Sequence, residues 1–228
     1  MKLRVAVPVA VGIVALFALP AFALTEKPKA SMSAAKPAAA KPAAPKTAEK
    51  APAAPVDSLT RLERMVAKDS TNFDNLYQLG VVYLDRERTP EAARVLEKAV
   101  SIRPNDVKAL VNLGAAQDAM GNGAAAQGYY RKALAASPGD SVATCRLASS
   151  LYAQQSYKES IGLLRKLIVD KPRSHCAYFT LGVAFADAGI YRDAIRMWKK
   201  VVAIAPQSPE AISANESIEV LERYVKGQ

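Results

Sequence analysis

The sequence predicts an all-α fold for residues 57–228, in which short helical hairpins stack into a solenoid. The first observation is a set of evenly spaced prolines, Pro104, Pro138, Pro172 and Pro206. Because the residue before a proline is disfavoured in the helical region, each proline marks a place where a helix ends. The second observation is that apolar residues between the prolines recur at helical spacing. A fixed period of about 34 residues is typical of a repeat array.

The period divides the chain into four units, which are residues 73–106, 107–140, 141–174 and 175–208. In the first unit, Leu76, Leu79 and Tyr83 are spaced i, i+3 and i+7 along the stripe of one helix. Ala92 and Leu96 begin the stripe of a second helix. Each hairpin leaves an apolar face that only its neighbour can cover, so we expect the units to stack.

Polar residues at the unit boundaries support the expected helix starts. Asp106, Asp140, Ser174 and Ser208 each follow a proline by two positions. A side-chain oxygen at such a position can accept a hydrogen bond from the free N–H groups of the next helix. We therefore expect these four residues to cap helices.

A half-unit flanks the four repeats on each side. Residues 58–68 are predicted to form a second helix without its first, because Leu62, Met65 and Val66 supply an apolar stripe. Residues 209–225 are predicted to form a capping helix that begins at Pro209, a residue favoured at the first helical position. The expected total is about ten helices.

The aligned units share a set of positions that, in the first unit, includes Leu79-Gly80, Tyr83, Ala92 and Pro104. This pattern resembles the tetratricopeptide repeat family, whose signature places Leu-Gly, an aromatic residue, Ala and Pro at these offsets. The resemblance covers all of residues 73–208. It implies a solenoid whose first helices line a concave groove that binds peptides or segments of other proteins.

The resemblance also implies which residues face the groove. They are Tyr77, Val81, Leu84, Lys108, Val111, Ala115, Asp118, Val142, Ser149, Tyr152, Phe179 and Val183. Most are apolar or aromatic, which is typical of binding surfaces. The alternative is that some of them pack between neighbouring helices. Some family members hold a C-terminal carboxylate in a basic cluster, but Lys108, Asn112 and Arg146 form only part of such a cluster, so that activity is not expected.

Residues 1–23 have the features of a secretory signal peptide. Lys2 and Arg4 precede an uncharged apolar run, and Ala21-Phe22-Ala23 offers the small-x-small pattern of a cleavage site. The alternative is an uncleaved membrane anchor formed by residues 5–24. In both cases the rest of the chain is expected to be exported, and the periplasm is its expected location.

Residues 24–56 are predicted to be a disordered linker, since they contain 12 Ala, 6 Pro and 6 Lys and cannot bury apolar area. The linker is expected to be a soluble spacer, and the alternative is a contact with an anionic surface such as a membrane through residues 1–56. Residues 1–56 hold 8 basic and 2 acidic side chains, out of a net charge of +10 for the chain. The repeat region is therefore only mildly basic, and nucleic acid is not expected as a partner.

Two cysteines fall on the first helices of adjacent units, Cys145 in the third and Cys176 in the fourth. An exported protein meets oxidising conditions, so a disulfide between them is expected if their Cα atoms lie within about 7 Å. The alternative is two small apolar residues that never meet. With a single His and no C-x-x-C spacing, no catalytic residue, metal site or cofactor is expected.

The expected function is a non-catalytic scaffold in the cell envelope that binds another protein or peptide segment in its groove. The alternative is a chaperone or assembly adaptor for envelope proteins, in outer-membrane assembly, cell-wall synthesis or cytochrome c maturation. That alternative follows from analogy of fold. The oligomeric state is left open.

Overall fold

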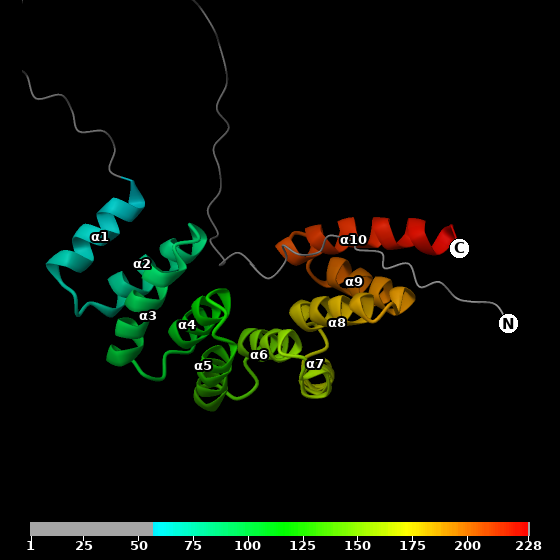
Figure 1. The fold of residues 1–228 in the computed structure, drawn as a ribbon, viewed down its shortest axis with the longest axis horizontal. Helices are drawn as coiled ribbons and strands as arrows, with labels where there is room; N and C mark the ends of the chain where they lie inside the picture. Colours follow the sequence, from blue (N-terminus) through cyan, green and yellow to red (C-terminus); the bar gives the residue numbers. More distant parts are fainter. Residues whose placement is uncertain (1–56, 228) are drawn as a thin grey trace, which may run out of the picture.

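The computed structural model describes residues 57–227, which fold into ten α-helices without a strand in this range. The helices are α1 (Ser58–Lys68), α2 (Phe73–Asp85), α3 (Thr89–Ile102), α4 (Val107–Ala119), α5 (Gly123–Ala136), α6 (Ser141–Ala153), α7 (Tyr157–Asp170), α8 (His175–Asp187), α9 (Tyr191–Ile204) and α10 (Pro209–Lys226). Four hairpins, from α2–α3 to α8–α9, lie between the single helices α1 and α10 (Figure 1). The predicted all-α helical-hairpin solenoid is thus confirmed.

The helices follow one another along an arc with α1 and α10 at its two ends (Figure 1). The first helices α2, α4, α6 and α8 each contact the next one in this series, and α10 continues it. Within residues 57–227, the second helices α3, α5, α7 and α9 contact only helices adjacent to them in the chain. Because first helices touch one another and second helices do not, the first helices form the inner wall of the arc.

The turn between the two helices of each hairpin uses the same backbone conformation in every repeat. Glu87, Gly121, Gln155 and Gly189 occupy equivalent positions in the four repeats, and their φ angles are 59°, 80°, 62° and 74°. This left-handed region costs a residue with a Cβ about 1–2 kcal/mol, whereas glycine adopts it readily. The first and third repeats therefore carry backbone strain that the second and fourth avoid.

Gln155→Gly is expected to stabilise the protein by about 0.5–1 kcal/mol, since the relief of left-handed strain exceeds the entropic cost of a glycine. Urea unfolding followed by circular dichroism measures the change. Gly121→Ala is the matched reverse variant, because a Cβ there would meet nothing within 4 Å and only the backbone term changes. A Gln155→Gly variant less stable than the parent would contradict this account.

Side-chain caps hold the starts of four helices. The residues whose side chains accept from the backbone N–H three positions later, at 2.8–3.1 Å, are Asn72, Asp106, Asp140 and Ser208. The expectation that Ser174 caps α8 is wrong: its side chain makes no cap hydrogen bond. Its hydroxyl lies instead 3.4 Å from the sulfur of Cys176, so the hydroxyl is turned away from the free N–H groups.

Each hairpin closes around a small residue of its first helix. A Cβ on Gly114 would overlap the ring of Tyr130, and a Cβ on Gly182 would overlap the indole of Trp198. Tyr130 and Trp198 are both buried in the core. The two helices of a hairpin therefore approach closely because a glycine leaves room for the large side chain opposite it.

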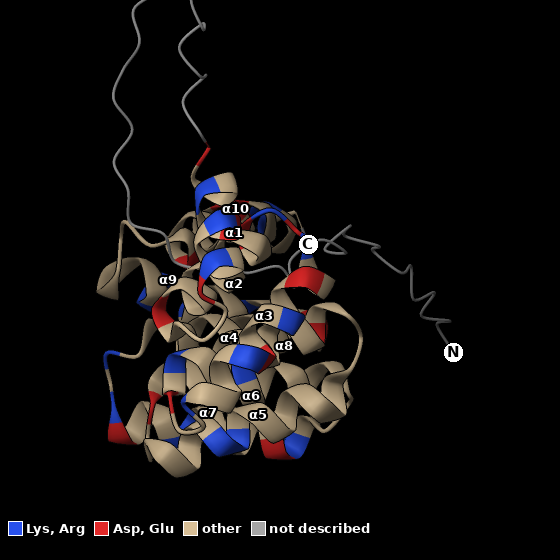
Figure 2. Ribbon diagram, turned by 90° about the vertical axis from the view of Figure 1, so that its left-hand side faces the viewer, with Lys and Arg blue, Asp and Glu red and all other residues tan. Residues whose placement is uncertain are grey.

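The signal peptide predicted for residues 1–23, its alternative as an anchor over 5–24 and the linker over 24–56 lie outside the described residues. Within residues 57–227, no helix has both the length and the apolar character that crossing a bilayer requires. In the view of Figure 2, basic and acidic positions are interspersed along these helices. This distribution fits the near balance of 23 basic and 19 acidic residues in 57–228.

Candidate functional site

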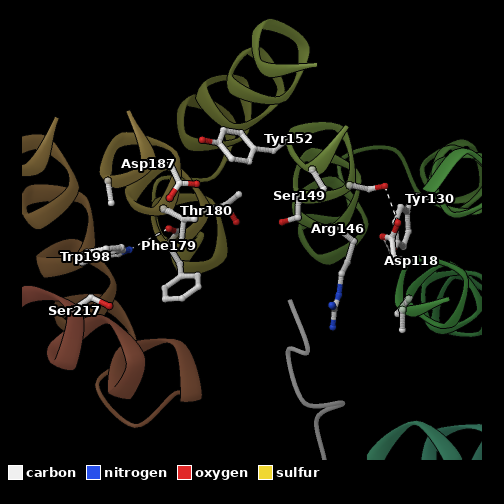
Figure 3. Close-up of a pocket in the computed structure, with 16 residues that line it drawn as sticks. Asp118, Tyr130, Arg146, Ser149, Tyr152, Phe179, Thr180, Asp187, Trp198 and Ser217 are labelled. Atoms are coloured by element: carbon white, nitrogen blue, oxygen red, sulfur yellow. Dashed lines mark hydrogen bonds between the residues drawn. The ribbon is translucent and has the colours of Figure 1, made fainter. Parts of the chain in front are cut away.

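The inner wall of the arc contains two adjoining hollows. The Tyr152 hollow has a volume of about 470 Å³ and is lined mainly by α4, α6 and α8 (Figure 3). The Lys108 hollow has a volume of about 690 Å³ and extends from α2 to the start of α10. Arg146, Ser149, Phe179 and Thr180 line both, so the two hollows form one continuous groove.

Eleven of the twelve predicted groove residues line this groove. Those in the Lys108 hollow are Tyr77, Val81, Lys108, Val111 and Val142, those in the Tyr152 hollow are Ala115, Asp118, Tyr152 and Val183, and Ser149 and Phe179 belong to both. Leu84 lines neither hollow. It packs, half-buried, against a core cluster built from residues of α1, α2, α3 and α4.

Asp118 joins three helices at the wall of the Tyr152 hollow. Its Oδ2 atom accepts a hydrogen bond of 2.9 Å from the Tyr130 hydroxyl on α5, and its Oδ1 atom accepts one of 2.8 Å from the Ser150 hydroxyl on α6. Burial raises the pKa of Asp118, although the two hydrogen bonds and the charge of Arg146 act in the opposite direction. The carboxylate is therefore partly desolvated yet faces the groove.

Tyr152 stands on α6 across from Asp187, the last residue of α8, and extends toward it in Figure 3. Its ring meets the ring of Tyr157 edge to face, with 4.9 Å between the centroids. Burial, reinforced by the charge of Asp187, raises the pKa of Tyr152 to about 12. Its hydroxyl therefore keeps its proton at neutral pH and serves as a hydrogen-bond donor at the mouth of the hollow.

The basic residues gather in the Lys108 hollow. Lys108 and Arg173 are exposed there, and Arg146 is half-buried between the two hollows. The Asn112 amide donates a hydrogen bond of 3.2 Å to the Tyr77 hydroxyl, so its donor is already engaged. From the sequence, Lys108, Asn112 and Arg146 were expected to form only part of a cluster that binds a C-terminal carboxylate. The structure places all three in the same hollow.

Glu210 is a groove residue that sequence reasoning missed. It lies in the first turn of α10, is only 9% exposed and lines the Lys108 hollow. Its Oε2 atom is buried and accepts no hydrogen bond within the described part of the chain; the His175 Nε2 atom is 3.9 Å away. No local pattern predicts this position, since it depends on how α10 folds back against α8.

The structure brings Cys145 and Cys176 together and joins their sulfur atoms, with 6.1 Å between the Cα atoms. The bridge connects α6 to α8, and both residues line the Lys108 hollow. It therefore ties neighbouring first helices together at the groove surface. Within residues 57–227, no three His, Cys, Asp or Glu side chains are arranged to hold a metal ion.

The groove consists of apolar walls with a few charged groups and a disulfide beside it. A model of the tetratricopeptide repeat family matches residues 77–141 and 145–209, together more than half of the chain. No curated protein matches the sequence.

Solved structures share the fold at low sequence identity. The crystal structure of MamA is 23% identical and has a TM-score of 0.55, covering 65% of this chain and 87% of its own. PilF of Pseudomonas aeruginosa is 23% identical with a TM-score of 0.57, covering 71% and 72%. YrrB, described as a tetratricopeptide repeat protein with an unusual peptide-binding site, is 22% identical with a TM-score of 0.51, covering 69% and 81%.

Proposed function

This chain belongs to the tetratricopeptide repeat family, and we propose that it is a non-catalytic scaffold of the cell envelope that holds a segment of another protein in its groove. The observation that carries the proposal is the continuous groove formed by the two hollows. Residues from α2, α4, α6 and α8 line it. A wall of this length suits an extended or helical segment better than a small molecule.

The chemistry of the wall favours a protein ligand. Tyr152, Phe179 and Val183 present aromatic and aliphatic surface, and such residues are the usual anchors of protein interfaces. YrrB, which shares the fold, is described as having a peptide-binding site. These observations support a protein or peptide segment as the occupant.

The envelope location is supported by two features of the chain. The apolar run and Ala21-Phe22-Ala23 have the pattern of an export signal. Cys145 and Cys176 lie where they form a bridge, and disulfides persist in oxidising compartments but are rare in the cytosol. We also propose that residues 1–56 contact the membrane.

Site-specific photo-crosslinking in intact cells tests the proposal. A photo-reactive amino acid at Ser149, which lines both hollows, is expected to capture one stoichiometric envelope protein. The matched control places the same group at Val169, which is 78% exposed on α7 and lines neither hollow. Equal capture from both positions, or none from Ser149, would count against a binding groove.

Truncation of the aromatic anchors gives the second arm of the test. Tyr152→Ala combined with Phe179→Ala is expected to weaken partner binding at least about thirtyfold, the effect of losing an interface hot spot. Because Phe179 is buried, the thermal unfolding curve of the variant shows whether it still folds. Unchanged affinity in a folded variant contradicts the groove assignment, whereas transient capture of many unfolded proteins favours the chaperone or assembly adaptor.

A further inference from the structure

The part of the groove that both hollows share is formed by two helices. Arg146 and Ser149 come from α6, and Phe179 and Thr180 come from α8 (Figure 3). The spacing between α6 and α8 therefore sets the width of the groove at the point where the two hollows join. A segment that occupies both hollows has to pass this point.

The bridge between Cys145 and Cys176 fixes that spacing. It links the N-terminal half of α6 to the N-terminal half of α8, and both cysteines line the Lys108 hollow. At the junction of α2 and α4, by comparison, a hydrogen bond of 3.2 Å runs from the Asn112 amide to the Tyr77 hydroxyl. Since the chain has only two cysteines, no other pair of first helices can be joined in this way within one chain. The shared part of the groove thus depends on the redox state of a single bond.

Apolar packing holds the same junction together independently of the bridge. A buried cluster from α6, α7 and α8 spans it and includes Ala148, Leu164, Leu167, Ala177 and Leu181. Helix α7 contacts both α6 and α8, so these residues keep the third and fourth repeats stacked when the bridge is broken. Reduction is therefore expected to loosen the spacing of α6 and α8 while the repeats stay folded.

A reductant can reach the bridge through the groove. Cys176 is half-buried and lines the Lys108 hollow, whereas Cys145 is only 6% exposed. Cys176 lies in the first turn of α8, and the Ser174 hydroxyl is 3.4 Å from its sulfur. The positive end of the helix and a hydroxyl donor both favour a thiolate at this sulfur. The Cys176 sulfur is therefore the accessible side of the bridge and is stabilised once the bridge is open.

We propose that the bridge between Cys145 and Cys176 is a redox switch for the groove, which binds its partner segment when oxidised and binds it more weakly when a dithiol has reduced the bridge. The inference rests on the proposed function, because it concerns the segment that the groove holds. In the oxidised chain, α6 and α8 are already held at the spacing seen in the structure. In the reduced chain, binding has to restore that spacing, and the ordering of the two helices opposes it.

The switch operates by thiol–disulfide exchange. One thiolate of the dithiol attacks the Cys176 sulfur, the bond between the two cysteines breaks, and Cys145 leaves as a thiolate that takes up a proton. The second thiolate of the dithiol then attacks the dithiol sulfur that is bonded to Cys176 and releases the Cys176 thiolate. The bridge gains two electrons, and the dithiol loses two as it closes into a disulfide.

Peptides that bind the groove measure the effect of reduction. Short peptides are selected from a displayed random library on the purified, oxidised full chain, and those that bind more weakly to the Tyr152→Ala/Phe179→Ala variant are kept. We expect their affinity to fall at least about tenfold after reduction with dithiothreitol, which is within the usual range of allosteric coupling. The full chain with both Cys145 and Cys176 replaced by serine should bind them as weakly as the reduced chain and should not respond to dithiothreitol.

Leu96→Ala separates the loss of the bridge from a loss of stability. Leu96 is fully buried in the first repeat and lines neither hollow, and its truncation destabilises the fold to an extent comparable with the loss of the bridge. The oxidised Leu96→Ala chain should bind the peptides within twofold of the parent. Because coupling is reciprocal, saturating peptide should also shift the equilibrium between the bridge and dithiothreitol toward the bridge by the factor that reduction takes from the affinity.

The other outcomes overturn the inference and distinguish it from the proposed function. Equal affinity of the oxidised and reduced chains, or tighter binding to the reduced chain, would exclude the switch, while the bound peptides would still support the scaffold. An equal loss of affinity in Leu96→Ala would show that the bridge acts only through overall stability, which also excludes the switch. A library that yields no groove peptide on the oxidised chain would contradict the proposed function and the inference together.

Discussion

Trp198→Ala is expected to lower the free energy of unfolding by about 3–5 kcal/mol, the range for removing a large buried aromatic side chain. Trp198 is 3% exposed and packs in the core cluster with Ile218 and Leu221 of α10. Its indole occupies the space left by Gly182. Its Nε1 atom also donates a hydrogen bond of 3.2 Å to the Phe179 carbonyl oxygen. The substitution therefore creates a cavity and removes a buried hydrogen bond between α9 and α8.

The loss should be local, because each repeat contacts only its neighbours. Hydrogen exchange is expected to show faster opening of α8, α9 and α10 and little change in α2 and α3. Circular dichroism in urea measures the overall change, since Trp198 is the only tryptophan and its fluorescence disappears with it. Trp198→Phe is the matched control and should recover much of the stability. A loss below about 1 kcal/mol would contradict the packing described for this site.

Replacing both Cys145 and Cys176 with serine is expected to lower the free energy of unfolding by about 3–4 kcal/mol. The residues are 31 apart in the sequence, and closing a loop of that length restricts the unfolded chain by roughly this amount. Urea unfolding of the oxidised protein, the reduced protein and the double variant measures the effect. The reduced protein should resemble the variant.

The bridge itself is checked before the stability is compared. The oxidised chain should show no free thiol on titration and should migrate differently on reducing and non-reducing gels. Cys145→Ser and Cys176→Ser as single variants should each expose one thiol and lose about as much stability as the double variant. Two free thiols in protein isolated from the envelope would contradict the predicted disulfide.

The repeat pattern predicts the helices well because it reports local geometry. Phe73, Val107, Ser141 and His175 begin the first helices at the same constant interval that separates the prolines in the sequence. The core positions follow from the same register, since Leu76, Leu79 and Tyr83 are all buried. Backbone and side-chain spacing within one hairpin is enough to place such residues.

The groove could be outlined from the sequence but its chemistry could not. Family register placed Tyr152, Phe179 and Ser149 on the inner wall, where the structure finds them. The same register put Leu84 there as well, but Leu84 lines neither hollow and packs, half-buried, against a core cluster of α1 to α4. The register therefore gives the position of a residue within its repeat, but it does not determine which of these positions line a hollow.

The linear order of residues thus established the helices, their pairing and the sense in which they stack, because these depend on spacing within a single repeat and its neighbour. Packing between repeats determined the chemistry of the groove. The bonds from Tyr130 and Ser150 to Asp118 join three helices, and Glu210 lines the groove only because α10 lies against α8. Such contacts depend on the angle at which helices cross, which no residue pattern within one repeat encodes.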